Sequence, residues 1–301
     1  MAEMPSLERC FEWSAAAADF VPAQSAAAEG AVNVLLLDSA TDIVDESAGA
    51  VVICGSHGGR YSAALAAQHG VRGIVFNDAG CGLDGAGVAG LELLEAASIP
   101  AVAIGHSTAR IGDAVDTWSR GRVTFVNAWA HGLGCTVGMS VRAAAAHLAR
   151  SGAPTERPST RPQEARHLLA QGPPAVWALD SASLVRTEDG GAVVLTGSHG
   201  GLIGGDPARA LKADVLAAAF NDAGVGTDAA GITRLPALSA RGIPACAVAA
   251  MSARIGDGRS TYEDGIVSAV NDAARDLGAH PGMSACDFVS LVTERVTQYH
   301  V

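Results

Sequence analysis

Short apolar runs alternate with longer alanine-rich stretches along most of this chain. Five runs in the first half have the length of a strand and end at Gly or a polar residue, and they span residues 33–38, 50–55, 73–77, 101–105 and 123–127. The stretches between and after them predict helices over 61–69, 86–97, 109–119 and 139–150. Strands that are apolar throughout and separated by helices are typical of a parallel sheet covered on both faces. The pattern therefore predicts an α/β fold.

The second half of the chain repeats the first. AGAVVICGSHGG (48–59) matches GGAVVLTGSHGG (190–201), residues 74–94 match 218–238, and residues 99–127 match 243–271. The offset is 142 residues between His57 and His199 and 144 between Asn77 and Asn221, which places two extra residues near Gly204. We therefore expect two tandemly duplicated, three-layer α/β halves with parallel-rich sheets, related by a pseudo-two-fold axis.

The repeat also sets the expected domain boundaries. Residues 1–30 precede the first repeat as an N-terminal extension, 31–150 form the first repeat, and 166–301 form the second. The Pro-rich polar segment 151–165 is predicted to link them. The strands of both halves could join in one sheet, but each half has enough strands for its own, and we favour separate sheets.

The amino-acid composition excludes several classes of function. A formal charge of −11 without a basic cluster argues against nucleic acid as a partner. Lys212 is the only lysine, which excludes a G-x-x-x-x-G-K-[ST] phosphate loop and leaves a Schiff-base enzyme only this one position. The six cysteines lack C-x-x-C spacing. No secretory signal and no apolar run of membrane-spanning length is visible, so a cytoplasmic protein without a membrane partner is expected.

Polar motifs follow the strands of both halves. Ligands of open parallel sheets bind at the carboxyl ends of the strands, where loops and helix N-termini gather. The candidate catalytic residues at these ends are Ser56, His57, Asp78, Cys81, His199 and Asp222. The candidate substrate-binding residues are Asn77, His106, Arg110, Asp113, Asn127, Ser198, Asn221, Arg254, Asp257 and Asn271.

Each motif also has a structural interpretation. Gly58-Gly59 suits a sharp turn, Asp78 and Asp222 suit helix caps, and Arg110 with Asp113 suits a local ion pair. The repetition is compatible with two sites, one composite site, or a shared structural need. Differences between the halves, such as His106 against Ala250, are expected if one composite site has specialised or if one half now serves only as scaffold, and we favour specialisation.

The leading hypothesis is hydrolysis of an amide or ester bond in a small, anionic, carboxylated metabolite. His57 would act as general base with Asp78 orienting it, and Arg110 and Arg254 would anchor the substrate carboxylate. A divalent metal held by the His and Asp side chains is a possible cofactor, although H-x-H and H-E-x-x-H spacings are absent.

A second hypothesis is nucleophilic catalysis by Cys81 with His57. A strand ending in Ser-His-Gly, followed by one ending in Asp-Ala-Gly-Cys, resembles the His–Gly and Asp–Ala–Cys strand ends of caspase-like cysteine peptidases over about 30 residues. The resemblance implies a thiolate nucleophile at Cys81. This chain departs from that pattern by the additional Gly80, and the second half has Val225 in place of the cysteine.

Two further alternatives remain open. Two similar halves could clasp a small anion without catalysis, or an isomerase or racemase could draw one acid–base group from each half. The alanine-rich helices 86–97 and 141–150 leave apolar faces that could pack the two halves together or form a homo-oligomer.

Overall fold

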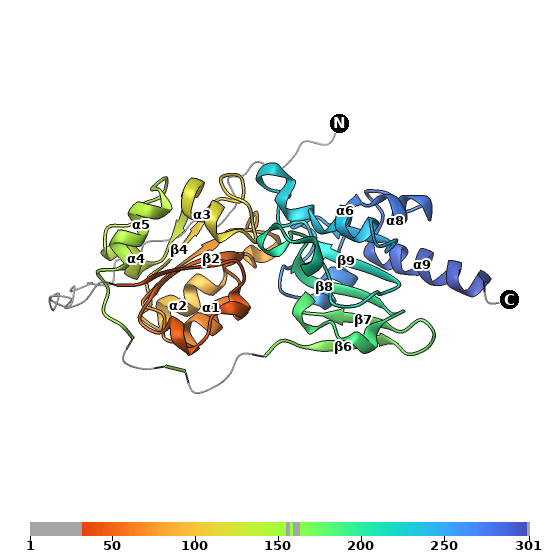
Figure 1. Cartoon of the computed structure of the whole chain (residues 1–301), viewed down its shortest axis with the longest axis horizontal. Coiled ribbons are helices and arrows are strands. Elements are labelled where there is room, and N and C mark those ends of the chain that lie inside the picture. Colours follow the sequence, from red (N-terminus) through yellow and green to blue (C-terminus); the bar gives the residue numbers. More distant parts are fainter. Residues whose placement is uncertain (1–31, 155–156, 159–162, 300–301) are drawn as a thin grey trace.

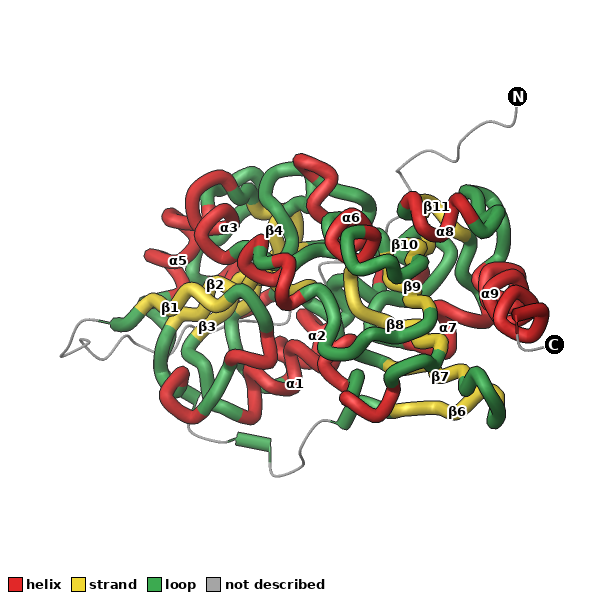
Figure 2. Tube along the Cα trace, turned by 45° about the vertical axis from the view of Figure 1, so that its right-hand side comes forward, coloured by secondary structure: helices red, strands yellow, loops and turns green. Residues whose placement is uncertain are grey.

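The strands form two separate sheets, one in each half of the chain (Figures 1 and 2). The computed structural model describes residues 32–154, 157–158 and 163–299, so the expected N-terminal extension lies outside the described residues. Each sheet is mixed but mostly parallel. The α/β class predicted from the apolar pattern is confirmed, and the alternative of one shared sheet is wrong.

The first sheet has its strands in sequence order. These are β1 (Val34–Leu37), β2 (Val51–His57), β3 (Gly73–Asn77), β4 (Ala101–Ile104) and β5 (Val123–Val126). The first four are parallel, as expected, but β5 runs antiparallel to β4. Val123, the first residue of β5, pairs with Ile104 at the carboxyl end of β4. The chain therefore starts β5 at the end of the sheet where β4 finishes, and the two strands run in opposite directions.

Alanine-rich helices cover both faces of this sheet. On one face lie α1 (Arg60–Gln68) and α2 (Gly90–Ala96), whose Ala63 and Leu94 pack on Phe76 of β3. On the other face lie α4 (Ala128–Gly132) and α5 (Val141–Leu148), while α3 (Ala114–Arg120) packs on β2. The small side chain of alanine lets these helices approach the strands closely. The core is therefore densely packed although it contains few aromatic residues.

The second sheet contains the same arrangement with one strand added. Its strands are β6 (Arg166–Ala170), β7 (Val176–Leu179), β8 (Val193–His199), β9 (Ala217–Asn221), β10 (Ala245–Val248) and β11 (Val267–Val270). The parallel strands are β7 to β10, and both edge strands, β6 and β11, are antiparallel. The covering helices are α6 (Arg234–Ser239), α7 (Gly258–Glu263), α8 (Asp272–Asp276) and α9 (Ala285–Tyr299).

One helix of the first half has no helical counterpart in the second. Two short 3-10 turns, Ile203–Gly205 and Pro207–Arg209, take the place of α1 between β8 and β9. Within the described residues, none of the helices is both long and apolar enough to cross a membrane.

The halves meet through the loops that follow the strands. A small apolar cluster joins them and consists of Ala79, Ile111, Ala223, Ala230 and Ile255. Backbone hydrogen bonds cross the boundary in matching pairs: the Leu83 N–H donates to the Ala250 carbonyl (2.8 Å) and the Thr227 N–H to the His106 carbonyl (2.9 Å). The carboxyl ends of the two sets of parallel strands therefore face each other.

Candidate functional site

A cavity of about 800 Å³ lies between the two halves. His57 at the end of β2 and His199 at the end of β8 both line it, as do the preceding Ser56 and Ser198. The seryl hydroxyls accept hydrogen bonds from the N–H groups of Ala40 and Ala182 (2.9 Å each) and so hold the loops beside the histidines. Equivalent residues from the two sequence repeats thus share one cavity.

A glycine two residues before each histidine lets neighbouring loops of the same half pack against the strand. A Cβ on Gly55 would lie 2.6 Å from the Asp38 carbonyl oxygen, and one on Gly197 would lie 2.4 Å from the Asp257 nitrogen. A larger residue at either position would displace the loops that help to form the cavity wall.

The same hydrogen bond fixes both imidazole rings. The Gly59 N–H donates to Nδ1 of His57 (3.1 Å), and the Gly201 N–H donates to Nδ1 of His199 (3.2 Å). A neutral ring that accepts at Nδ1 carries its proton on Nε2. Among the described residues, no hydrogen bond engages Nε2 of either ring. Each ring can therefore offer an Nε2–H donor to a ligand.

Burial keeps both rings neutral. It lowers the pKa of His57 to about 4 and, together with the nearby charge of Arg234, lowers the pKa of His199 well below its usual value. Because Nδ1 is occupied and Nε2 is protonated, neither ring has a free lone pair to accept a proton from water. The general-base role expected for His57 does not fit this geometry, whereas hydrogen-bond donation to a carbonyl oxygen or an oxyanion does.

The remaining lining is rich in charge. The cations are Arg60, Arg209, Lys212, Arg234 and Arg254, and the acids are Asp84, Glu164, Asp180 and Asp257. Three of these cations already have partners, and one of them, Arg234, donates to the Gly201 and Ala210 carbonyl groups. Arg254 pairs with Asp84 (2.6 Å) across the boundary between the halves, and the Lys212 ammonium donates to the Ser183 carbonyl (2.6 Å).

Glu164 is the carboxyl group suited to proton transfer. Burial, followed by the charge of Asp180, raises its pKa to about 7, while hydrogen bonds from Ser181 and Ser183 oppose the shift. Tyr61 lies close enough for the charge of Glu164 to contribute to raising the pKa of its phenol, after burial. A carboxyl group with a pKa near 7 can both accept and donate a proton at neutral pH.

Asp78 and Asp222 are not the partners of the cavity histidines, contrary to the expectation from sequence. Oδ1 of Asp78 accepts from the N–H groups of Gly80 (3.0 Å) and His106 (2.9 Å), and it lies 2.8 Å from Nδ1 of His106. Asp222 accepts from the N–H groups of Gly224 and Ala250 in the same way (2.9 Å each). Both carboxylates brace loops at the boundary between the halves, and neither lines the cavity. They do not cap helices either.

The four predicted asparagines also lie outside the cavity and support backbone. The Asn127 amide oxygen caps α4 and accepts from the Ala101 N–H, and Asn271 serves α8 and β10 in the same way. Asn77 and Asn221 each accept from the N–H group two residues later. These amides are buried and already hydrogen-bonded, so the structure does not support the substrate-binding role predicted for them.

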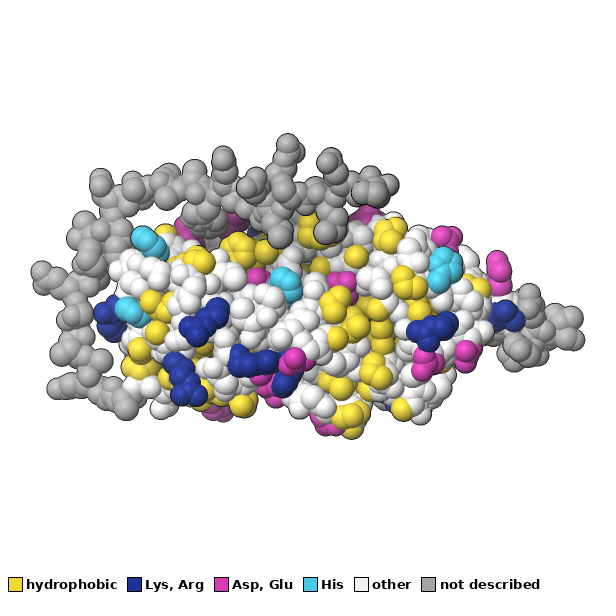
Figure 3. Space-filling view, turned by 90° about the horizontal axis from the view of Figure 1, so that it is seen from above, with side chains coloured by type: hydrophobic (Ala, Val, Ile, Leu, Met, Phe, Trp, Pro, Cys, Tyr) yellow, Lys and Arg dark blue, Asp and Glu magenta, His cyan; other side chains and the backbone are white. Residues whose placement is uncertain are grey.

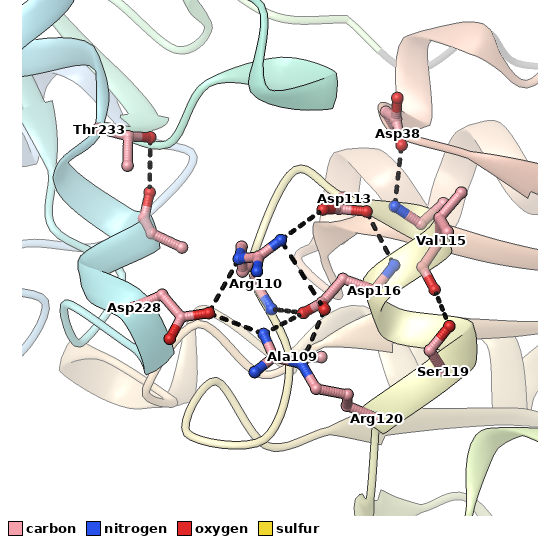
Figure 4. Close-up of polar contacts among 12 residues, drawn as sticks. Asp38, Ala109, Arg110, Asp113, Val115, Asp116, Ser119, Arg120, Asp228 and Thr233 are labelled. Atoms are coloured by element: carbon pink, nitrogen blue, oxygen red, sulfur yellow. Dashed lines mark hydrogen bonds and ion pairs between the residues drawn. The ribbon is translucent and has the colours of Figure 1, made fainter.

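Arg110 belongs to an ion cluster at the boundary between the halves (Figure 4). It bonds to Asp228 of the second half (2.9 Å) and to Asp113 (3.3 Å), and Arg120 bonds to both Asp228 (2.9 Å) and Asp116 (2.7 Å). Figure 3 shows acidic and basic side chains meeting near the middle of the molecule. The structural interpretation of the Arg110–Asp113 pair is confirmed, and neither residue reaches the cavity. Arg254 and Asp257, their counterparts in the second half, do line it.

Cys81 and His106 lie outside the cavity as well. Cys81 has a positive φ (61°) in the tight turn after β3, and Val225 has the same value after β9. The ring of His106 pairs with Asp78, and this hydrogen bond raises its pKa. No group of three or more His, Cys, Asp and Glu side chains is placed to hold a metal ion in the part of the chain that the structure describes.

Sequence reasoning therefore found one part of the cavity and missed another. It identified Ser56, His57, Ser198, His199, Arg254 and Asp257. It missed Arg60, Tyr61, Glu164, Arg209 and Arg234, and it considered Lys212 only as a Schiff-base residue. One signal was available, because Arg234 stands where the first repeat has Gly90.

No known protein family, curated protein or solved structure matches this chain.

Proposed function

We propose that the protein hydrolyses an amide or ester bond of a small carboxylated substrate held in the cavity between its halves. The observation that carries the proposal is that His57 and His199 are fixed in the same neutral form and line one cavity together with several cations. Neutral Nε2–H donors suit the oxygen of a carbonyl group that gains negative charge during acyl transfer.

Glu164 supplies the proton transfer in this proposal. Its carboxylate takes a proton from water as the water oxygen attacks the carbonyl carbon, and the resulting oxyanion accepts hydrogen bonds from the Nε2–H groups. When the tetrahedral intermediate collapses, the protonated Glu164 returns the proton to the departing nitrogen or oxygen. The products are a carboxylic acid and an amine or alcohol, and Glu164 is restored.

The composite site is best explained by duplication of one α/β unit, with the copies related by a pseudo-two-fold axis. Matching strand orders, β1 to β5 and β7 to β11, support this proposal. The reciprocal ion pairs Arg110–Asp228 and Arg254–Asp84 support it as well, because each residue lies 144 positions from its counterpart.

Small chromogenic esters and anilides, with and without a carboxylate, test the hydrolysis directly. We expect turnover of carboxylated compounds and a loss of roughly 10²–10³-fold in kcat for His57→Ala and His199→Ala, the usual effect of removing one oxyanion donor. Gln presents an N–H at a similar position, so His57→Gln should retain part of the rate. His147→Ala is the control, because His147 lies on α5 and contacts the Leu133 carbonyl.

Two outcomes would contradict the proposal. One is turnover that is unchanged in both alanine variants, which would rule out the oxyanion role of His57 and His199. The other is tight binding of carboxylated compounds without any turnover, which would favour the non-catalytic binding protein. The donor geometry of the two rings already gives less support to a two-base isomerase or racemase, because neither neutral ring can remove a proton at Nε2.

A further inference from the structure

Arg234 is a buried cation without an acidic partner among the described residues. It begins α6, lines the cavity and is only 5% exposed. Its Nε donates to the Gly201 carbonyl (3.0 Å), one Nη donates to the Ala210 carbonyl, and the guanidinium lies 5.3 Å from the centre of the Phe220 ring. Its second Nη group makes no hydrogen bond within the described part of the chain.

This arrangement is costly unless something supplies negative charge. Burial, followed by the charge of nearby Arg209, lowers the pKa of Arg234 to about 10, so the guanidinium remains charged at neutral pH. A buried charge destabilises a protein unless it is paired with an opposite charge. The two carbonyl groups orient the guanidinium but do not neutralise it. The open cavity beside it can admit an anion.

The first half has no room for such a residue. Gly90 occupies the position of Arg234 in the first repeat, and a Cβ there would lie 2.5 Å from both the Ala63 Cβ and the Gly59 carbonyl oxygen. Helix α1 fills the space, whereas the second half has only 3-10 turns in its place. The second of these turns ends in Arg209, an exposed residue that lines the same cavity.

We propose that Arg234 and Arg209 form an anion-binding subsite, next to His199, that belongs to the second half alone. It takes a terminal carboxylate or phosphate group of the ligand and leaves the reacting bond towards His57, His199 and Glu164. The ligand therefore binds the two similar halves in one orientation. The subsite deepens the proposed function and rests on it for the reaction, but not for anion binding.

Calorimetric titration of the full chain with inorganic phosphate and, separately, with succinate tests the subsite. We expect at least one of the two anions to bind, and Arg234→Gln and Arg209→Gln each to weaken it about tenfold or more, as loss of a charge-assisted contact does. Arg60→Gln is the matched control, since Arg60 lines the cavity from the first half, and its effect should stay within about threefold. Phosphate binding alone would identify a phosphate ligand, and succinate binding a carboxylate ligand.

Unchanged affinity in both second-half variants would overturn the subsite, as would the absence of binding by both anions. Arg209 is exposed, so Arg209→Gln decides the matter if Arg234→Gln does not fold. The two proposals fail separately. Anion binding that depends on Arg209, without hydrolysis, contradicts only the reaction, whereas hydrolysis with unchanged KM in both variants contradicts only the subsite.

Discussion

Glu164 makes a prediction that depends on pH. Its folded pKa of about 7 lies above the ordinary value of 4.5, so folding favours the protonated carboxyl. The charged form therefore costs stability, and this cost grows as pH rises from about 4.5 to about 7. Denaturant unfolding should show that Glu164→Gln stabilises the protein at pH 8 and has little effect near pH 4. The same variant should lose hydrolysis at pH 8, where the wild-type Glu164 is ionised and acts as the base.

Glu188→Gln is the control for this experiment, because Glu188 is exposed and pairs only with the neighbouring Arg186 among the described residues. A stability change in Glu164→Gln that is equal at pH 4 and pH 8 would show that Glu164 has no raised pKa.

The two cavity histidines should make the protein less stable as the pH falls. The folded pKa of His57 is about 4, below the ordinary 6.5, so between these values the unfolded chain binds more protons. Stability should therefore fall as pH drops below about 6.5, by up to about 1.4 kcal/mol per pH unit for each such group. Unfolding measured from pH 7 to pH 4 should show a shallower decline in His57→Gln than in the wild type. Equal slopes would contradict a neutral buried ring.

The position of His57 and His199 was predictable, because a titratable residue directly after a buried strand faces the sheet edge where ligands bind. The form of their rings was not, because it depends on N–H groups of Gly59 and Gly201 whose direction only the folded turn sets. Asp78 was misassigned for a related reason. Its carboxylate meets backbone donors in its own turn and in the loop after β4 before it can reach His57.

At the scale of elements, the loops after β3 and β9 bring the halves together. Gly80 (φ 71°) and Gly224 (φ 73°) touch, so that a Cβ on Gly80 would lie 3.0 Å from the Gly224 Cα. Gly80→Ala should destabilise the protein through both the positive φ and the clash between backbones. Gly242→Ala shares the positive φ (69°) and meets nothing within 4 Å.

Thermal unfolding of the two variants separates these effects. Gly242→Ala should cost about 1–2 kcal/mol, the usual penalty of a left-handed alanine, and Gly80→Ala should cost clearly more. Equal losses would show that the contact between Gly80 and Gly224 does not hold the halves together.

Helices and strands could be predicted from the sequence where the spacing of apolar residues fitted only one type of secondary structure. The strand expected over 73–77 is β3 without change. The helix expected from residue 109 begins only at Ala114, because Gly112 has a positive φ (81°) and Asp113 caps the helix. The direction of β5 could not be read from its sequence, since parallel and antiparallel edge strands share the same alternation of residues.

At the scale of the whole molecule, exposed ion pairs join the two halves in addition to the apolar cluster. Asp228 bonds to both Arg110 and Arg120, so Asp228→Asn removes two charged contacts between the halves. Hydrogen exchange at the Thr227 amide, which donates to the His106 carbonyl across the boundary, should become faster, most of all at low salt.

Asp214→Asn is the matched control, because Asp214 pairs with Arg241 (2.7 Å) inside the second half. Exchange at Thr227 that is no faster in Asp228→Asn than in Asp214→Asn would contradict a role of Asp228 in joining the halves.

The composite cavity itself could be anticipated only in outline. The sequence repeat is compatible with matching residues that share one site, but the choice between one site and two depends on how the halves pack. The second half has space for Arg234 because two 3-10 turns stand there in place of a helix. In the first half, α1 occupies the corresponding space. Hydrophobic patterns and residue propensities predict each helix or strand separately. They do not show which space a missing helix leaves open for another side chain.

The most direct test of the shared cavity is ¹⁵N NMR of the histidine side chains, assigned with His57→Gln and His199→Gln and recorded at pH 7 before and after adding a slowly hydrolysed carboxylated amide, whose carbonyl oxygen reaches both rings in the proposed complex. Both rings should be neutral with the proton on Nε2, and both Nε2 resonances should shift on binding. A proton on Nδ1 in either ring, or Nε2 resonances that do not move when the protein is saturated, would contradict a cavity in which the two halves bind one ligand.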